Sequence, residues 1–230
     1  MVLSTAAEDY LKTIYKLREA NANADGDSAP VTTQAIADGL QVAAPSATAM
    51  VKKLAGLKLV AHEPYRGVTL TSAGEKIALE VIRHHRLVET FLSEVLGMDW
   101  DQVHAEAEKW EHVLSEEVEA KIVEALNNPT HDPHGAPIPT LDGKIADEGW
   151  QPLLRACEGD CVTVRRVSDR NPAVLRHLRE VGLVPGARLE VLRAAPESGV
   201  LELQVEEQAR IIGAEPARAV WVSHDNKEGK

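Results

Sequence analysis

The sequence predicts a mainly α-helical protein with a small β domain at its C-terminal end. Three observations support this fold class. Apolar residues recur at helical spacing up to about residue 127, the period changes to strand alternation beyond Trp150, and Pro and Gly gather between these parts at 130–140. The 230 residues are 44% hydrophobic and 27% charged, which is typical of a folded soluble protein of two or three domains.

The N-terminal third has the pattern of a winged helix-turn-helix. Thr32 or Thr33 can cap a short helix, and Pro45 suits the first position of the helix that follows. Apolar residues in that second helix recur at the spacing of a buried face. The expected elements are a helix (8–19), a polar loop (21–30), a short helix that carries Ile36, Ala37 and Leu40, a helix (44–56) and two strands (59–64 and 67–71).

A helical segment follows, and capping residues and helix breakers mark its boundaries. Residues 72–75 have the spacing of a capping box, and Gly97 ends the long helix that begins there. Residues 99–102 repeat this spacing and predict the start of a second helix. Acidic residues after Ser115 predict a further helix start, and the Asn and Pro residues of 127–129 end that helix.

Beyond Trp150 short alternating runs predict strands, with one helical piece at about 173–181 between them. The predicted strands are 161–167, 188–192, 200–206, 209–213 and 219–223. Five short strands in about 75 residues favour a small β-barrel or sandwich. The predicted domains are residues 1–73, 74–144 and 145–230.

The charge is distributed unevenly along the chain, although the net charge is −11. Residues 1–73 hold seven basic and seven acidic side chains, and residues 74–144 hold six basic and fifteen acidic ones. Six of the nine His also lie between positions 84 and 134. This distribution indicates cation binding in the middle of the chain and leaves DNA binding possible at the front.

The sequence has few cysteines and shows neither a membrane span nor a signal peptide, and these features predict the cellular compartment. Two Cys in this length suit a reducing cytoplasm better than a disulfide scaffold. No run approaches the roughly 18 apolar residues of a membrane span, and the acidic N-terminus does not suit a signal peptide. A cytoplasmic protein without a membrane partner is expected.

Histidine and carboxylate side chains recur at helical spacing in the acidic segment. The six candidates are His85, Glu89, His104, Glu108, Glu111 and His112. The last four stand at i, i+4, i+7 and i+8, so one helix would carry them on one face, and the first two form an i, i+4 pair on the preceding helix. Two such helices can supply six ligands to divalent metal.

The alternative interpretation of these six side chains is a solvated face with salt bridges. The neighbouring apolar residues predict otherwise, because they mark the adjoining side of the helix as buried, and unpaired carboxylates beside a buried side are unfavourable. These apolar residues are Val103, Ala107, Trp110, Val113 and Leu114.

Three segments in order, AEDYLKTIYKL (7–17), RHHRLVETFL (83–92) and VHAEAEKWEHVLSEEVE (103–119), resemble the diphtheria toxin repressor family of metal-dependent transcriptional regulators. Within this family, the chain is most similar to manganese transport regulators that carry an additional C-terminal domain, a small Src-homology-3-like barrel. The resemblance is close over residues 4–142 and covers the last 80 residues by pattern only.

The resemblance implies two metal sites. The primary site falls on Asp9, Glu108, Glu111 and His112, and the second site falls on His85, Glu89 and His104. Iron-responsive members have Met and Cys at the positions of Asp9 and Glu108. Carboxylate and imidazole ligands suit manganese(II), so manganese is the expected cofactor, with zinc, cobalt or cadmium as substitutes; activation by iron(II) as well stays an open alternative.

This chain departs from the family pattern at three places. Lys12 stands where some manganese regulators have a further Glu. The positions at which the barrel can donate ligands read Asn171 and Val174, so we expect the barrel to tune affinity or assembly rather than complete the second site. Where the family binds an anion through an Arg, we expect Arg86 to pair internally with Asp132 instead.

The implied DNA interface is the helix over 44–56, which would enter the major groove of a palindromic operator as part of a homodimer. Its short side chains read bases weakly, so DNA shape should supply much of the specificity. Lys52 and Lys53 could reach phosphates, and Arg66 lies at the wing tip. The candidate DNA-binding residues are Thr33, Gln34, Pro45, Ser46, Thr48, Ala49, Lys52, Lys53 and Arg66.

The sequence therefore predicts a manganese-dependent transcriptional repressor of metal-uptake genes, and no enzyme. Two alternatives stay open: a winged-helix sensor of a small organic ligand, and a metal-assisted hydrolase that uses His85, Glu89, His104 and Glu108 as a two-metal centre.

Three further features have plainer interpretations. Cys157 and Cys161 are expected to be ordinary buried side chains, His131 and His134 surface residues, and His84 a core or interface residue.

Overall fold

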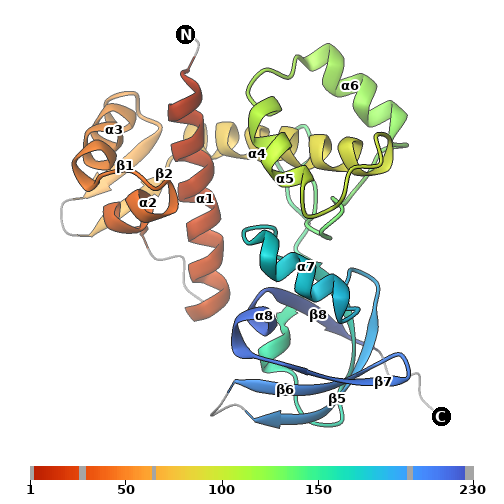
Figure 1. The fold of residues 1–230 in the computed structure, drawn as a ribbon. Coiled ribbons are helices and arrows are strands. Elements are labelled where there is room, and N and C mark those ends of the chain that lie inside the picture. The colour runs from red at the N-terminus through yellow and green to blue at the C-terminus, as the bar shows by residue number, and fades with distance from the viewer. Residues whose placement is uncertain (1–2, 26–29, 64–65, 196–198, 226–230) are drawn as a thin grey trace. The chain divides into compact units, whose positions relative to one another are not determined.

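The chain folds into two compact units, each of which draws on several stretches of the sequence. The computed structural model describes residues 3–25, 30–63, 66–195 and 199–225. The first unit comprises residues 1–85, 110–115 and 139–144, and the second comprises residues 86–109, 116–138 and 145–230. Figure 1 labels the elements of both.

The first unit contains the predicted winged helix-turn-helix. Its elements are α1 (Thr5–Asp25), α2 (Thr33–Gly39), α3 (Ala44–Gly56), β1 (Val60–Glu63), β2 (Gly67–Leu70) and the first half of α4 (Ser72–Glu94). The Thr32 hydroxyl accepts a hydrogen bond from Ala35 N and caps α2, and Pro45 lies in the first turn of α3, as predicted. The wing is an antiparallel hairpin, and Val31 pairs with Val68 beside it.

Helix α1 is longer than predicted. The polar loop expected over 21–30 is wrong for residues 21–25, which continue the helix. This stretch alternates Asn with Ala, and Ala has the highest helix propensity of all residues, so propagation of the helix outweighs the turn preference of Asn. Residues 26–29 of the predicted loop lie outside the described residues.

The helices after the wing follow the predicted breaks with one change at the start of α5. Helix α4 ends before Gly97, α5 spans Val103–Trp110, and α6 spans Glu116–Ala125. The start predicted at 99–102 is a turn, in which the carbonyl oxygen of Asp99 accepts the backbone N–H of Gln102 at 2.8 Å, and the carbonyl oxygen of Trp100 contacts the His134 ring at 2.8 Å. None of the described helices is long and apolar enough to cross a membrane.

The C-terminal β domain lies in the second unit and contains the five predicted strands. Its elements are β3 (Gln151–Pro152), a 3-10 turn (Leu153–Arg155), β4 (Cys161–Val167), α7 (Pro172–Glu180), β5 (Arg188–Ala195), β6 (Val200–Val205), β7 (Gln208–Ile212), α8 (Ala214–Arg218) and β8 (Val220–His224). The antiparallel sheet has the order β3-β8-β4-β5-β6-β7. Aliphatic side chains such as Val164, Leu178 and Leu203 form its core.

The connector of residues 130–138 packs against the β domain within the second unit. The backbone N–H of Val167 donates to the carbonyl oxygen of His134 at 2.8 Å. Gly135 has φ +83°, and a Cβ added there would lie 1.9 Å from the carbonyl oxygen of Arg165. Only glycine permits this close approach, which fixes the connector against β4.

Candidate metal centre and nucleic-acid interface

A first donor set lies in the first unit, between α1 and the turn that follows α5. We define it as Asp9, Glu111 and His112, whose ligand atoms lie within 4.8 Å of one another. His112 Nε2 is 2.8 Å from Asp9 Oδ1 and 3.1 Å from Glu111 Oε1. On the other side of the ring, His112 Nδ1 is 2.7 Å from Glu8 Oε2. A carboxylate on Nδ1 orients the ring so that Nε2 points at the other two donors.

Glu111 is fully buried and carries two basic partners. Lys12 Nζ donates to Oε1 at 2.6 Å, and His85 Nδ1 lies 2.5 Å from Oε2. Burial alone would raise the pKa of Glu111, but His85 and Lys12 outweigh it and lower the pKa below its usual value. For Asp9, burial outweighs the basic neighbours and raises the pKa. The site therefore holds at least one charged carboxylate without metal.

The helical face predicted for this site is wrong in part. Helix α5 ends at Trp110, so Glu111 and His112 lie in the turn that follows it. We call the last residue of α5 and this turn together the 110–113 turn; its Trp110 and Val113 are 40% and 79% exposed. His84 Nδ1, 3.1 Å from the Glu111 carbonyl oxygen, contacts this turn. Helical spacing does not apply beyond residue 110. The prediction that Trp110 and Val113 mark a buried side is therefore wrong.

A second donor set lies in the second unit. We define it as Glu89 on α4, His104 on α5 and Asp169 in the loop between β4 and α7. His104 Nδ1 is 3.1 Å from Glu89 Oε1 and 3.2 Å from Asp169 Oδ2, and His104 Nε2 is 3.7 Å from Glu108. Burial lowers the pKa of His104, but the hydrogen bonds and charges of Asp169 and Glu89 outweigh it and raise the pKa to about 10.

Asp169 lies in the loop between β4 and α7, and its carboxylate faces the second donor set from the β domain. Asn171, one of the two positions considered, instead caps α7 by accepting from Ala173 N at 3.0 Å. In the sequence, Asp169 stands two residues before Asn171. Its local spacing does not distinguish it from other acidic residues, so sequence reasoning missed it. The predicted pairing of His85 with Glu89, and of Glu108 with Glu111, joins residues of different units and stays a prediction.

His134 is a core residue, which corrects its expected place on the surface. It is 1% exposed, its ring stacks on Trp100, and its Nδ1 lies 3.8 Å from Glu89 Oε2. That nitrogen is buried without a hydrogen-bond partner among the described residues. Burial lowers the pKa of His134, but Glu89 and Asp132 outweigh it and raise the pKa to about 9. Glu89, Asp132 and His134 also place three ligand atoms within 4.8 Å of one another.

Arg86 and Asp132 form the predicted internal ion pair. Arg86 Nε lies 3.7 Å from Asp132 Oδ2, and both residues are buried. The other carboxylate oxygen accepts the backbone N–H groups of His134 and Ala136 at 2.8 and 2.9 Å. These contacts compensate the buried charge within the connector, so no external anion is needed for that purpose.

Both donor sets have the chemistry of a site for a hard divalent cation. Each combines carboxylate oxygens with imidazole nitrogen, and the orphaned Nδ1 of His134 is a buried group that a cation beside Glu89 would satisfy. No sulfur atom belongs to either donor set. Cys157 and Cys161 are free thiols and lie exposed in the β domain, not buried as expected.

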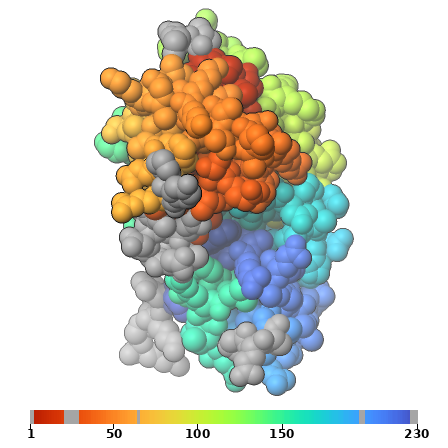
Figure 2. All heavy atoms as spheres, turned by 90° about the vertical axis from the view of Figure 1, so that its left-hand side faces the viewer, coloured from red at the N-terminus to blue at the C-terminus, as the bar shows by residue number. Residues whose placement is uncertain are grey.

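The winged helix-turn-helix, coloured orange, faces the viewer in Figure 2, and most of the candidate DNA-binding residues are exposed. Pro45, Ser46, Ala49, Lys52, Lys53, Gln34 and Arg66 are exposed, and Thr33 and Thr48 are half-buried. The hydroxyl of Thr48 donates to the carbonyl oxygen of Ala44 at 2.9 Å, and Gln34 donates to Asp38. Arg66 makes an exposed ion pair with Glu63, which a phosphate could replace.

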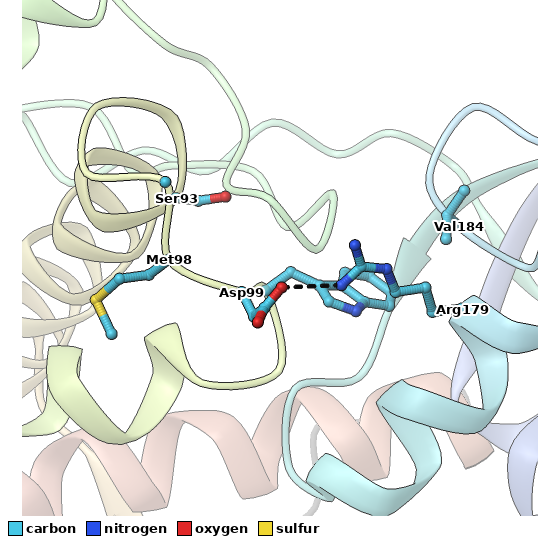
Figure 3. A pocket seen from close by; sticks show the side chains of 7 residues that line it. Ser93, Met98, Asp99, Arg179 and Val184 are labelled. Carbon is cyan, nitrogen blue, oxygen red and sulfur yellow. Dashed lines mark hydrogen bonds and ion pairs between the residues drawn. The ribbon is translucent and has the colours of Figure 1, made fainter.

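An open hollow of about 360 Å³ lies in the second unit beside the loop after α4. In Figure 3, Asp99 points at Arg179 across it, with Ser93 and Met98 on one side and Val184 on the other. The carboxylate and the guanidinium lie 3.3 Å apart. Because these two charges compensate each other, the hollow offers no unpaired charge to a ligand.

Three family models of known proteins match successive segments of this chain. Residues 2–68 match the iron dependent repressor N-terminal DNA binding domain, residues 71–140 match the iron dependent repressor metal binding and dimerisation domain, and residues 151–224 match the FeoA domain.

Individual proteins are similar over nearly the full length. The iron-dependent repressor IdeR of Mycobacterium leprae is 33% identical over 96% of this chain and 97% of its own. The diphtheria toxin repressor of Corynebacterium efficiens is 37% identical over 91% and 87%. A solved structure described as a manganese-dependent transcriptional repressor in complex with manganese has a TM-score of 0.87 at 36% identity, over 95% of this chain and 99% of that one. The chain therefore belongs to the iron dependent repressor family, the family of the diphtheria toxin repressors.

Proposed function

We propose that manganese(II) is the ion to which this repressor responds, and that it represses metal-uptake genes in the cytoplasm. The observation that carries the proposal is the first donor set, in which two carboxylates and one imidazole converge without sulfur. Oxygen and nitrogen ligands suit manganese(II), whereas thiolate and thioether favour softer ions. The similarity to a structure described as manganese-dependent supports the same choice.

Asp9, Glu111 and His112 would hold the activating ion, with Glu108 as a proposed fourth ligand. Glu8 positions His112 by contacting Nδ1, and Nε2 then faces Asp9. A bound ion supplies positive charge where carboxylates converge. Asp9 lies on α1, and the other two donors lie in the 110–113 turn, so shared ligation ties α1 to that turn.

A second ion would lie on the second donor set, with His85 and His134 as further proposed ligands. Asp169 belongs to the β domain, whereas Glu89 and His104 belong to the helical segment. Ligation by all three would fix the β domain against α4 and α5. We also propose the domain boundaries 1–73, 74–144 and 145–230, which the ranges of the three matching family models support.

The DNA-bound form is proposed to be a homodimer on a palindromic operator. Large apolar side chains are exposed in the helical segment, which supports self-association. They are Val95, Leu96, Trp110, Val113 and Val118. Helix α3 would enter the major groove, with Ser46, Thr48 and Ala49 near the bases and Lys52 and Lys53 near phosphates.

The test is a DNA-binding titration with purified full-length protein. An operator is first selected from random duplexes in the presence of manganese(II), and fluorescence anisotropy then measures its affinity with manganese(II), iron(II), zinc(II) or chelator. We expect tight binding with manganese and weak binding with chelator. Equal affinity in all four conditions would contradict a metal-responsive repressor, and activation by iron alone would contradict the choice of manganese.

A further inference from the structure

Lys12 is a buried lysine on α1, in contact with the first donor set. It is 5% exposed, on the same side of α1 as Glu8 and Asp9, one turn further along the helix. Its ammonium group donates to Glu111 Oε1 at 2.6 Å. A lysine is seldom buried to this degree unless a charged partner compensates it.

The same carboxylate oxygen belongs to the first donor set. Glu111 Oε1 lies 3.1 Å from His112 Nε2, which is itself 2.8 Å from Asp9. The other oxygen of Glu111 faces His85 at 2.5 Å. A cation between Asp9 and His112 therefore reaches Glu111 through the oxygen that Lys12 already occupies.

We propose that Lys12 is an internal competitor of the activating metal ion, which lowers the affinity of the first donor set and thereby sets the metal concentration at which the repressor responds. This inference rests on the proposed function of that set. Without metal, the ammonium group neutralises Glu111 and holds α1 against the 110–113 turn. A divalent ion takes the oxygen only when the ammonium group gives it up.

The charge balance supports this role. Asp9 and Glu111 carry two negative charges when ionised, and Lys12 compensates one of them. A divalent ion at this site therefore meets one negative charge fewer than it would without Lys12, and it also meets a fixed positive charge a few ångströms away. Both effects weaken metal binding, and both are absent from a variant with a neutral side chain at position 12.

The decisive experiment compares Lys12→Met with wild-type protein by calorimetric titration of manganese(II) and by thermal unfolding with and without chelator. We expect Lys12→Met to bind the ion at the first donor set at least about tenfold more tightly. We also expect it to unfold at a lower temperature than wild type in chelator, because a buried carboxylate loses its partner. Manganese should therefore stabilise the variant by more than it stabilises wild type.

Three matched variants define the outcome. Lys12→Gln keeps a hydrogen-bond donor without the charge and should also bind manganese more tightly, so it decides the matter if Lys12→Met does not fold. Lys12→Arg keeps the charge and should stay within a few-fold of wild type. Lys16→Met removes a lysine one turn further along α1 and should change neither measurement.

One result would overturn this inference, and a different result would contradict the proposed function. Unchanged or weaker manganese binding by both neutral variants, with lower stability, would make Lys12 a structural residue and overturn the inference. Failure of the wild-type protein to bind manganese at all would contradict the proposed function instead, so the two failures are distinguishable.

Discussion

Glu111 and Glu89 are the two carboxylates with no exposed side-chain surface in their donor sets. An ionised carboxylate in such a place is stable only with positive or hydrogen-bonding partners. Lys12 and His85 supply them for Glu111, and His104 supplies one for Glu89. In the proposed metal-bound form, a metal ion would replace these partners, so the same side chains would serve stability without metal and binding with it.

His104 predicts a pH dependence of the metal-free protein. Asp169 and Glu89 outweigh burial and raise its pKa in the folded state from the ordinary 6.5 to about 10, so the charged imidazole stabilises the fold fully below about pH 6.5. This contribution is lost as the pH rises towards 10. In chelator, the free energy of unfolding should therefore fall between pH 7 and pH 10, by at most about 1.4 kcal/mol per pH unit for this group.

Urea unfolding at several pH values measures this slope. His104→Gln should show a shallower slope than wild type, and His62→Gln, a substitution in the wing, should keep the wild-type slope. If His104→Gln keeps the full slope, the imidazole is not held charged by Asp169 and Glu89.

At the scale of elements, the connector contacts β4 closely at Gly135, where the backbone of the one lies directly against the backbone of the other. Gly135→Ala places a methyl group 1.9 Å from the Arg165 carbonyl oxygen at φ +83°, so the connector must shift. Gly159 is the matched control, because it has φ +84° but no atom within 4 Å of the added Cβ. We expect Gly159→Ala to destabilise by about 1–2 kcal/mol and Gly135→Ala by clearly more, in urea unfolding. Equal losses would mean that the connector is not fixed at this point.

The loop between β4 and α7 predicts a role for the β domain in metal binding. Asp169→Ala should weaken the second metal ion by at least about tenfold and leave the first unchanged, because the carboxylate faces His104 only in the second donor set. Calorimetric titration of manganese separates the two binding events. Asp147→Ala removes an exposed carboxylate from the same unit and serves as the control. Loss of both events in Asp169→Ala would indicate a structural effect instead.

The elements that the sequence predicts well are those with local signals. Pro45 marks the start of α3, Gly97 marks the end of α4, and alternation marks the strands of the β domain. Asp169 has no such signal, because its position beside His104 and Glu89 is defined by tertiary packing. Trp110 likewise has the spacing of a buried residue, but the helix ends there, and periodicity gives no information about the turn that follows.

At the scale of the whole molecule, function requires that metal binding and DNA binding influence each other. The acidic excess lies in residues 74–144, and the exposed lysines of α3 lie in residues 1–73. Asp9 belongs to the DNA-binding segment by sequence, whereas Glu111 and His112 belong to the acidic one. By linkage, DNA must raise the metal affinity by the factor by which metal raises the DNA affinity, typically about 5–150-fold.

The manganese dependence of operator binding in Asp9→Ala tests this account most directly. The substitution removes the ligand that α1 contributes to the first donor set, and Glu19→Ala, which removes another carboxylate from α1, is the control. We predict that manganese raises the operator affinity of wild type and Glu19→Ala by a factor in the range given above, and that the affinity of Asp9→Ala barely changes, while its fold and dimer persist. Full manganese dependence in Asp9→Ala would contradict the account, because the ion would then act without tying α1 to the 110–113 turn.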